Sequence, residues 1–389
     1  MIFLDESGVS LLPVVRRTWA PRGKTPVITH HFNWKRLSIT SVSRLPAPGA
    51  RFAALEQRRG RMVGVRWQKA IDPEAWQNVV LEAGAAVRSL HLPPVVAAPE
   101  WPLDHERLSD LRVRWPRETR PAYDGRVLLP LRRAIGRHVR LELAHIPQPV
   151  SSVVLIEVVN GNRAHRVAID LHDLSSFRDV ELVRSCLVYF KMQHRIGGYS
   201  IPHVVPGGVL FDKGTIYWYL PYLRRLRDRK AFSCDVCGRF GLRFNAELRR
   251  RTVETLSTQQ RFAFRGGLRR VPRPSFLKEI ARSRVCIDLP GQGDAFSFRT
   301  IDYLAVGACI VGTRPKNELP APLIDRVHMA FTRDDQSDLI DLCEYYIENE
   351  DAREQMVTAT RRFFDRYLHA DSLAAYYLHT CLARLAETE

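Results

Sequence analysis

The chain has 389 residues, of which 45% are hydrophobic and 26% charged, and it carries a formal net charge of +17. This length suffices for two or three domains, and no apolar run approaches the ~18 residues that a membrane-spanning helix needs. The first residues, MIFLDES, include two acids and no basic segment, so we do not expect a secretory signal. We therefore expect a cytoplasmic protein.

The positive charge suits nucleic acid, acidic small molecules or an anionic membrane surface. Only eight of the 59 basic residues are lysines, and the basic residues are spread along the whole chain. The charge alone therefore does not decide among these partners, and we do not expect nucleic acid to be one. Peripheral association with an anionic membrane surface remains an alternative, because the positive charge would favour it.

Residues 1–44 contain two characteristic runs, Phe3-Leu4-Asp5-Glu6-Ser7-Gly8 and Arg17-Thr18-Trp19-Ala20-Pro21-Arg22-Gly23, before a strand predicted at 37–43. They resemble the start of the RNase H-like catalytic domain of mariner-like insertion-sequence transposases of the DDE class. The resemblance implies that Asp5 would bind metal in an intact transposase. The second and third acidic motifs of that family are missing downstream, and one carboxylate cannot hold two metal ions.

The amino-terminal segment is thus interpreted as an incomplete, β-rich transposase fragment. An inactive remnant of a DDE transposase, an enzyme of DNA strand transfer, is the alternative function for the chain. A non-functional fusion from a disrupted gene is a third interpretation. Residues 45–119 are rich in Arg, Pro, Ala and Trp, and we interpret them as a poorly ordered linker or junction rather than as an aromatic–basic nucleic-acid surface.

From residue 121 the pattern becomes regular. A helix is predicted at 127–136, and strands at 139–144, 153–160, 167–171 and within 185–193. Candidate reactive groups flank the ends of these strands: Asp124, His145, Asp170, His172, Asp173 and Lys191. His172 lies between two aspartates, which suits either acid–base chemistry or a turn in which an aspartate caps the next element.

A second half opens at Phe232 with the strand FSCDVCG, followed by Arg239 and a helix at 246–257. Cys234 and Cys237 form a C-x-x-C, but no second pair or suitably placed histidine completes a zinc site. We expect buried thiols, no bound metal and no cofactor. A second strand is predicted at 261–266, and helices at 338–349, 352–367 and 373–385.

The most informative stretch, 275–313, reads as helix, strand, glycine turn, helix and strand. Such alternation predicts a parallel sheet covered on both faces, with ligands outside the carboxyl ends of its strands. That edge is Pro290-Gly291-Gln292-Gly293-Asp294, whose glycines and following helix start suit a phosphate. Arg299 could add a charge-assisted contact, and Asp302 lies on the same helical face. The plain alternative is a turn followed by a helical ion pair.

The sequence SFRTIDYLAVGACIV resembles the donor-binding signature of GT-B glycosyltransferases, especially the exostosin-like and spore-maturation-like groups. The resemblance extends loosely over roughly residues 120–380. It implies an α/β protein with two Rossmann-like domains facing a cleft, which transfers a sugar from a nucleotide-sugar donor to a glycan, lipid or protein acceptor. The implied donor-binding residues are Arg239, Gly291, Gln292, Gly293, Ser297, Arg299 and Asp302.

Asp294 and Asp302 have the spacing of the two glutamates found in many GT-B families, but both are aspartates. The resemblance assigns the nucleotide ribose to Asp302. It leaves the acid–base group unassigned, with Asp170, His172, Asp173 and Asp294 as candidates. The implied organisation is a transposase-like fragment (1–44), a junction (45–119), an acceptor domain (120–228), a donor-binding domain (229–370) and a helix returning across the cleft (371–389).

Overall fold

The computed structural model describes residues 101–119, 127–211, 214 and 216–388, together with the backbone of a small antiparallel ribbon, β1 (Gln57–Arg58) and β2 (Arg61–Met62). The chain divides into two compact units, Met1–Leu92 and Pro93–Glu389, and all other described elements belong to the second. The transposase-like segment 1–44, with Asp5, lies outside the described residues, as does Asp124.

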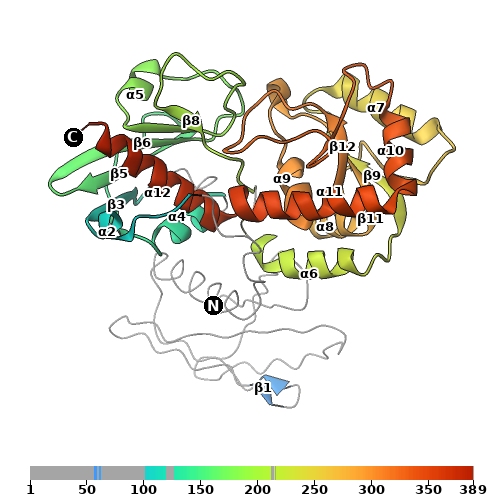
Figure 1. The fold of residues 1–389 in the computed structure, drawn as a ribbon, viewed down its shortest axis with the longest axis horizontal. Helices are drawn as coiled ribbons and strands as arrows, with labels where there is room; N and C mark the ends of the chain where they lie inside the picture. Colours follow the sequence, from blue (N-terminus) through green and yellow to red (C-terminus); the bar gives the residue numbers. More distant parts are fainter. Residues whose placement is uncertain are drawn as a thin grey trace, which may run out of the picture. The chain divides into compact units, whose positions relative to one another are not determined.

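The α/β class predicted from the sequence is confirmed, because the second unit holds two sheets with helices packed against them (Figure 1). The first sheet is mixed and has the order β4-β3-β5-β6-β7-β8. Its strands are β3 (Leu111–Pro116), β4 (Arg140–Ala144), β5 (Val153–Asn160), β6 (Arg163–Asp170), β7 (Val188–Lys191) and β8 (Val204–Pro206). β5 and β6 pair antiparallel on either side of the turn at Asn160-Gly161-Asn162, where Gly161 has a φ of 56°.

Residues 101–119 correct the sequence analysis, which assigned them to a poorly ordered junction. They form α2 (His105–Ser109) and β3, and β3 pairs with both β4 and β5. Trp115 on β3 is fully buried in the apolar core. The alternation of apolar side chains with arginines in LRVRWP is the pattern of a strand that buries one face.

The second sheet is entirely parallel and has the order β10-β9-β11-β12-β13. Its strands are β9 (Cys234–Arg239), β10 (Phe264–Gly267), β11 (Ser283–Asp288), β12 (Cys309–Thr313) and β13 (Ala330–Thr332). Neighbouring side chains on β11 point to opposite faces: Cys286 packs in one apolar cluster, and Val285 and Ile287 in another. A parallel sheet covered on both faces was predicted for this half and is confirmed.

Helices cover the two faces of this sheet in two groups. α8 (Arg273–Ala281) and α9 (Phe298–Val306) supply one cluster, and α6 (Ile216–Asp228) packs against both helices. The opposite cluster contains side chains from α7 (Ala246–Thr258), α10 (Leu339–Glu348) and α11 (Glu350–Phe363). Two short helices of the first half are α4 (Leu129–Ile135) and α5 (Val180–Arg184).

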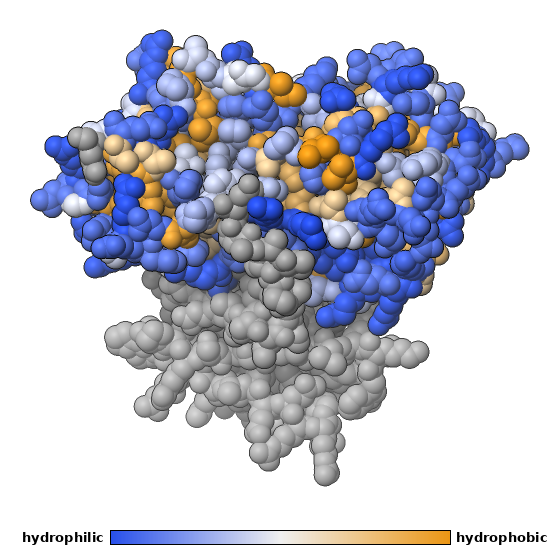
Figure 2. Space-filling view, viewed as in Figure 1, coloured by the Kyte–Doolittle hydropathy of each residue, from blue (hydrophilic) through white to orange (hydrophobic). Residues whose placement is uncertain are grey.

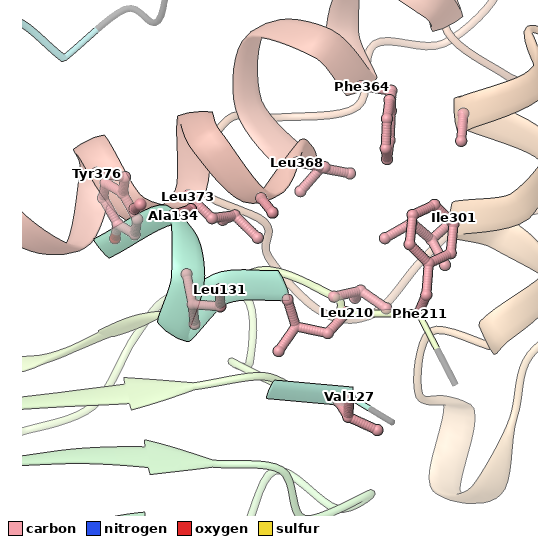
Figure 3. Close-up of a cluster of buried hydrophobic side chains, with 14 of the residues drawn as sticks. Val127, Leu131, Ala134, Leu210, Phe211, Ile301, Phe364, Leu368, Leu373 and Tyr376 are labelled. Atoms are coloured by element: carbon pink, nitrogen blue, oxygen red, sulfur yellow. The ribbon is translucent and has the colours of Figure 1, made fainter. Parts of the chain in front are cut away.

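The last helix links the two sheets. α11 continues through a π-helical turn (Phe364–Leu368) into α12 (Ala370–Ala386), which packs against α4 and β7 of the first sheet. The ring of Phe190 on β7 stacks on Tyr377, with centroids 3.7 Å apart. Figure 3 shows the apolar cluster that joins these parts, with labelled side chains from α4, the segment at Leu210 and Phe211, α9 and α12. Apolar burial therefore couples the two halves of this unit.

The view in Figure 2 shows a mostly hydrophilic surface over the described residues, with apolar side chains gathered in a few places. None of the helices in this part of the chain combines the length and the apolar character needed to cross a bilayer.

Candidate functional site

The order of the parallel sheet creates a topological switch between β9 and β11. These neighbouring strands are followed by helices that cover opposite faces, α7 after β9 and α9 after β11. Ligands of open α/β sheets bind in the crevice outside the carboxyl ends of such strands. Two segments form this edge here: residues 240–245, and residues 289–297, which we call the glycine turn.

The glycine turn is tightly folded. Its backbone closes through hydrogen bonds from Gly291 N to Ala295 O (2.7 Å) and from Ala295 N to Gln292 O (3.0 Å). Gly293 has a φ of 57°, a conformation that L-residues with a side chain adopt at a cost. The turn ends at Ser297, the N-cap of α9, whose Oγ accepts from the Thr300 N–H. The Phe298 and Arg299 N–H groups therefore remain available at the start of the helix.

Two buried or partly buried arginines and an asparagine tie the loops at this edge together. Arg249 on α7 donates to both Gly241 O and Pro290 O, at 2.5 Å each. Asn245 donates to Gly291 O (2.7 Å), and Arg299 donates to Leu289 O (3.0 Å). The loops at the carboxyl ends of β9 and β11 are thus framed by two guanidinium groups.

The charge balance of this frame is positive. Burial and the nearby Arg299 lower the pKa of Arg249 to about 10, so it is still charged at pH 7. The opposing charge is Asp288, which accepts from Ser297 Oγ (3.2 Å) and Thr300 Oγ1 (2.5 Å). Burial raises the pKa of Asp288, and Arg299 opposes that rise. Arg299 Nε is itself buried and has no hydrogen-bond partner among the described residues.

The residues predicted from the sequence to bind the donor fall into two groups. Gly291, Gln292, Gly293, Ser297 and Arg299 lie together on the glycine turn and the first turn of α9. The other two form ion pairs with α8.

Arg239, the last residue of β9, forms a bidentate pair with Glu279, at 2.5 and 2.9 Å. Asp302 is only 1% exposed, and its Oδ1 accepts from Arg273 Nη2 at 2.7 Å. The ion pairs with Glu279 and Arg273 by themselves account for the positions of Arg239 and Asp302, without a diphosphate or a ribose as partner. The guanidinium of Arg243, in the loop after β9, lies 5.0 Å from the ring of neighbouring Phe244.

On the first sheet, Asp170 and Lys191 meet at the carboxyl ends of β6 and β7. Lys191 Nζ lies 2.7 Å from Asp170 Oδ2, and both side chains are essentially inaccessible. Tyr189 OH donates to the same oxygen, at 2.8 Å. Burial lowers the pKa of Lys191, and Asp170 opposes that shift. Such a fully engaged carboxylate is not available as a proton acceptor.

The loop after β6 carries the other acid–base candidates. The backbone N–H of His172 donates to Asp170 Oδ1 (2.8 Å), and Arg178 Nη2 lies 3.0 Å from His172 Nε2. Burial lowers the pKa of His172, as do Lys191 and Arg178. The neutral ring therefore accepts the Arg178 hydrogen bond with Nε2. Asp173 is exposed, and no hydrogen bond to its carboxylate is found among the described side chains.

This loop and the end of β7 reach the glycine turn. A Cβ built on Gly293 would lie 2.6 Å from Leu174 Cδ2, so the two residues are in close proximity. Gln193 forms two hydrogen bonds with the backbone of Phe296. On the far side of the turn, Lys316 Nζ pairs with Asp294 Oδ2 at 2.8 Å. Loops that follow strands of the first sheet therefore contact the glycine turn of the second sheet. His145, at the end of β4, makes none of these contacts.

The sequence analysis missed Asp288, Arg249, Asn245, Gln193 and Lys316. Asp288 had a signal, because a carboxylate stands inside the apolar run 285–289 at the end of a strand. The other four lie in segments with no motif, and their partners are distant in sequence. Only the tertiary structure brings them together.

A family model described as glycosyl transferase-like matches residues 223–379. This range contains the whole parallel sheet, the glycine turn and part of α12, and covers less than half of the chain. The match supports glycosyltransferase activity in general, and the predicted resemblance is confirmed to that extent. Residues 1–44, the basis of the transposase resemblance, lie outside it. No curated protein matches the chain.

Proposed function

We propose that this protein transfers a sugar from a nucleotide-sugar donor, with the donor diphosphate held by the glycine turn and the start of α9. The observation that carries the proposal is the positive frame of Arg249 and Arg299 around this turn, at the switch point of a sheet inside the glycosyl transferase-like region. Departure of a nucleoside diphosphate requires stabilisation of developing negative charge. Preoriented N–H groups and guanidinium groups provide that stabilisation.

Arg299 is the residue that we assign most directly to the leaving diphosphate. Its Nη2 is anchored on Leu289 O and its guanidinium lies 5.1 Å from the Phe240 ring, which fixes the group. A cation that is already fixed in place costs little to reorganise when charge develops.

We assign Asp173 as the base that removes the proton from the acceptor hydroxyl. Of the four candidates, Asp170 is buried against Lys191, His172 Nε2 is engaged by Arg178, and Asp294 is paired with Lys316. Asp173 is exposed and adjoins Leu174, which contacts the glycine turn. In this role its carboxylate takes the proton of the acceptor hydroxyl as that oxygen bonds to the anomeric carbon and the bond to the diphosphate breaks.

The test is a calorimetric titration with UDP, GDP and ADP, followed by slow hydrolysis of the matching nucleotide-sugar with water as the acceptor. We expect one nucleotide to bind the wild type, and Arg299→Ala to lose about 100- to 1,000-fold in turnover. Asp173→Asn should keep nucleotide affinity and lose turnover. Arg229→Ala, at an exposed arginine just after α6, is the matched control. Binding of none of the three nucleotides would overturn the proposal.

A further inference from the structure

The side chain of Gln193 forms a pair of hydrogen bonds that joins the two halves of the second unit. Its Oε1 accepts from Phe296 N at 3.0 Å, and its Nε2 donates to Phe296 O at 3.3 Å. One side chain thus satisfies both the backbone N–H and the backbone C=O of Phe296, an arrangement that we call an amide clamp. Gln193 is 1% exposed, so water cannot readily replace these hydrogen bonds.

The position of this contact is specific. Phe296 immediately precedes Ser297, the N-cap of α9, and belongs to the glycine turn. Gln193 follows β7 by two residues, and Met192 between them donates its N–H to Asp170 O at 2.9 Å. The clamp therefore connects the start of α9 to the segment that carries Asp170 and, beyond it, His172 and Asp173.

Other polar contacts between the halves involve a different segment. His194 Nδ1 lies 2.9 Å from Glu318 Oε2, and Arg195 forms an isolated antiparallel bridge with Asn317. These contacts hold the loop after β12 rather than the glycine turn. Among the described side chains of the first sheet and its loops, Gln193 is the one that hydrogen-bonds to the glycine turn.

We propose that Gln193 is a positioning residue for glycosyl transfer: it fixes the donor side of the site at a set distance from the acceptor side. The inference rests on the proposed function. A misplacement of about 1 Å between reacting groups can cost about 100-fold in rate. Loss of the clamp should therefore lower turnover, whereas nucleotide affinity should persist because the groups that frame the diphosphate all lie on the second sheet and its helices.

The chain contains a control for this contact. Gln148 clamps the backbone of Leu155 in the same manner, with Leu155 N to Oε1 at 2.8 Å and Nε2 to Leu155 O at 3.0 Å, and its Nε2 also donates to Ile146 O at 3.0 Å. That clamp lies entirely within the first half of the unit, far in sequence from the glycine turn. Gln148→Met therefore removes at least as many hydrogen bonds as Gln193→Met, and both keep a side chain of similar length, so the pair separates positioning from a general loss of stability.

The experiment measures three quantities on the wild type and both variants: the Tm, the Kd for whichever of UDP, GDP and ADP binds the wild type, and kcat and KM for hydrolysis of the matching nucleotide-sugar. We expect both variants to lower Tm. Only Gln193→Met should lower kcat, by about 10- to 100-fold, with Kd unchanged.

Equal turnover in Gln193→Met and Gln148→Met would overturn the positioning role and leave the proposed function standing. Loss of nucleotide binding in Gln193→Met would also overturn it, because the residue would then act on donor affinity. If the wild type binds none of the nucleotides, the proposed function fails, and this inference fails with it.

Discussion

Leu174 closes over Gly293 so tightly that a Cβ on the glycine would lie 2.6 Å from the leucine Cδ2. The two residues belong to different halves of the unit: Leu174 follows β6, and Gly293 lies in the glycine turn after β11. Gly293 is therefore constrained twice, by its positive φ and by its neighbour. The contact sets how near the acceptor-side loop comes to the turn that we assign to the donor.

The first prediction separates these two constraints. Gly161 has a φ of 56°, and a Cβ added there would meet nothing within 4 Å in the described part of the chain, whereas Gly293 has a φ of 57° and the Leu174 contact. Gly161→Ala should cost about 1 kcal/mol for the left-handed conformation. Gly293→Ala should cost a further ~1–3 kcal/mol because the leucine must move. Urea unfolding measures both values.

The double variant Gly293→Ala/Leu174→Ala provides the check. Removing the leucine methyls should relieve the steric part, so the cost of the alanine at position 293 should fall to that of Gly161→Ala. A cost that stays unchanged without Leu174 would show that this contact does not exist in solution.

The second prediction concerns Asp302, to which the resemblance assigns the nucleotide ribose. Its carboxylate is buried and accepts from Arg273, so we expect a structural role. Asp302→Asn should lower the free energy of unfolding by about 1.5–3 kcal/mol, the range for a hydrogen bond between charged groups. Nucleotide Kd should not change. Glu181→Gln, which weakens the exposed pair with Arg184, is the control and should cost less than ~1 kcal/mol. Retained stability with a raised Kd would instead favour the ribose contact.

Much of the fold follows from local sequence. The strand predicted at 153–160 coincides with β5, and the helix predicted at 246–257 with α7, because periodicity and turn residues agree there. One strand extends beyond its predicted start. The strand predicted at 167–171 begins at Arg163 in β6, because cross-strand pairing with β5 continues through its polar residues. Here tertiary contacts override the local signal.

The local structure of the candidate site was predictable only where one contiguous segment forms it. The run from Gly291 to Arg299 carries its own turn, cap and helix start, so the sequence alone predicted that these residues lie together. Arg249 and Gln193 act through backbone groups 41 and 103 residues away. The partners of such side chains are set by strand order, which no local pattern encodes. Asp302 shows the converse: its spacing was recognised, but its burial against Arg273 was not.

The third prediction concerns the buried pair of Asp170 and Lys191. Removing one partner leaves an uncompensated charge in a site closed to water, which costs about 3–5 kcal/mol. Lys191→Met should therefore destabilise the protein strongly, and Asp170→Asn alone should leave the ammonium unpaired. The double variant removes both charges, and its cost should fall well below the sum of the single variants. Urea unfolding of the four proteins gives the coupling energy, and simple additivity would contradict the buried pair.

The fourth prediction uses Asp288, whose pKa is raised by burial beneath the start of α9. Between its unfolded pKa and its higher folded pKa, the folded protein binds more protons at this group than the unfolded chain does. The contribution of Asp288 to stability therefore falls as the pH rises through that window, which begins near 3.8. Below the window the carboxyl is neutral in both states, and above it the full cost of the buried charge is present.

The measurement is the unfolding free energy of the wild type minus that of Asp288→Asn, followed from about pH 3 to pH 7. This difference should decrease with rising pH. Asp335 is the control of opposite sign: its pKa is lowered by the backbone N–H of Ser337, so its contribution should be present above the unfolded pKa and lost as the pH falls. A flat Asp288 difference would mean that the carboxylate is as well stabilised in the fold as in water. In that case Asp288 would carry its full negative charge at neutral pH beneath the site that we assign to the diphosphate, at no net cost to the fold.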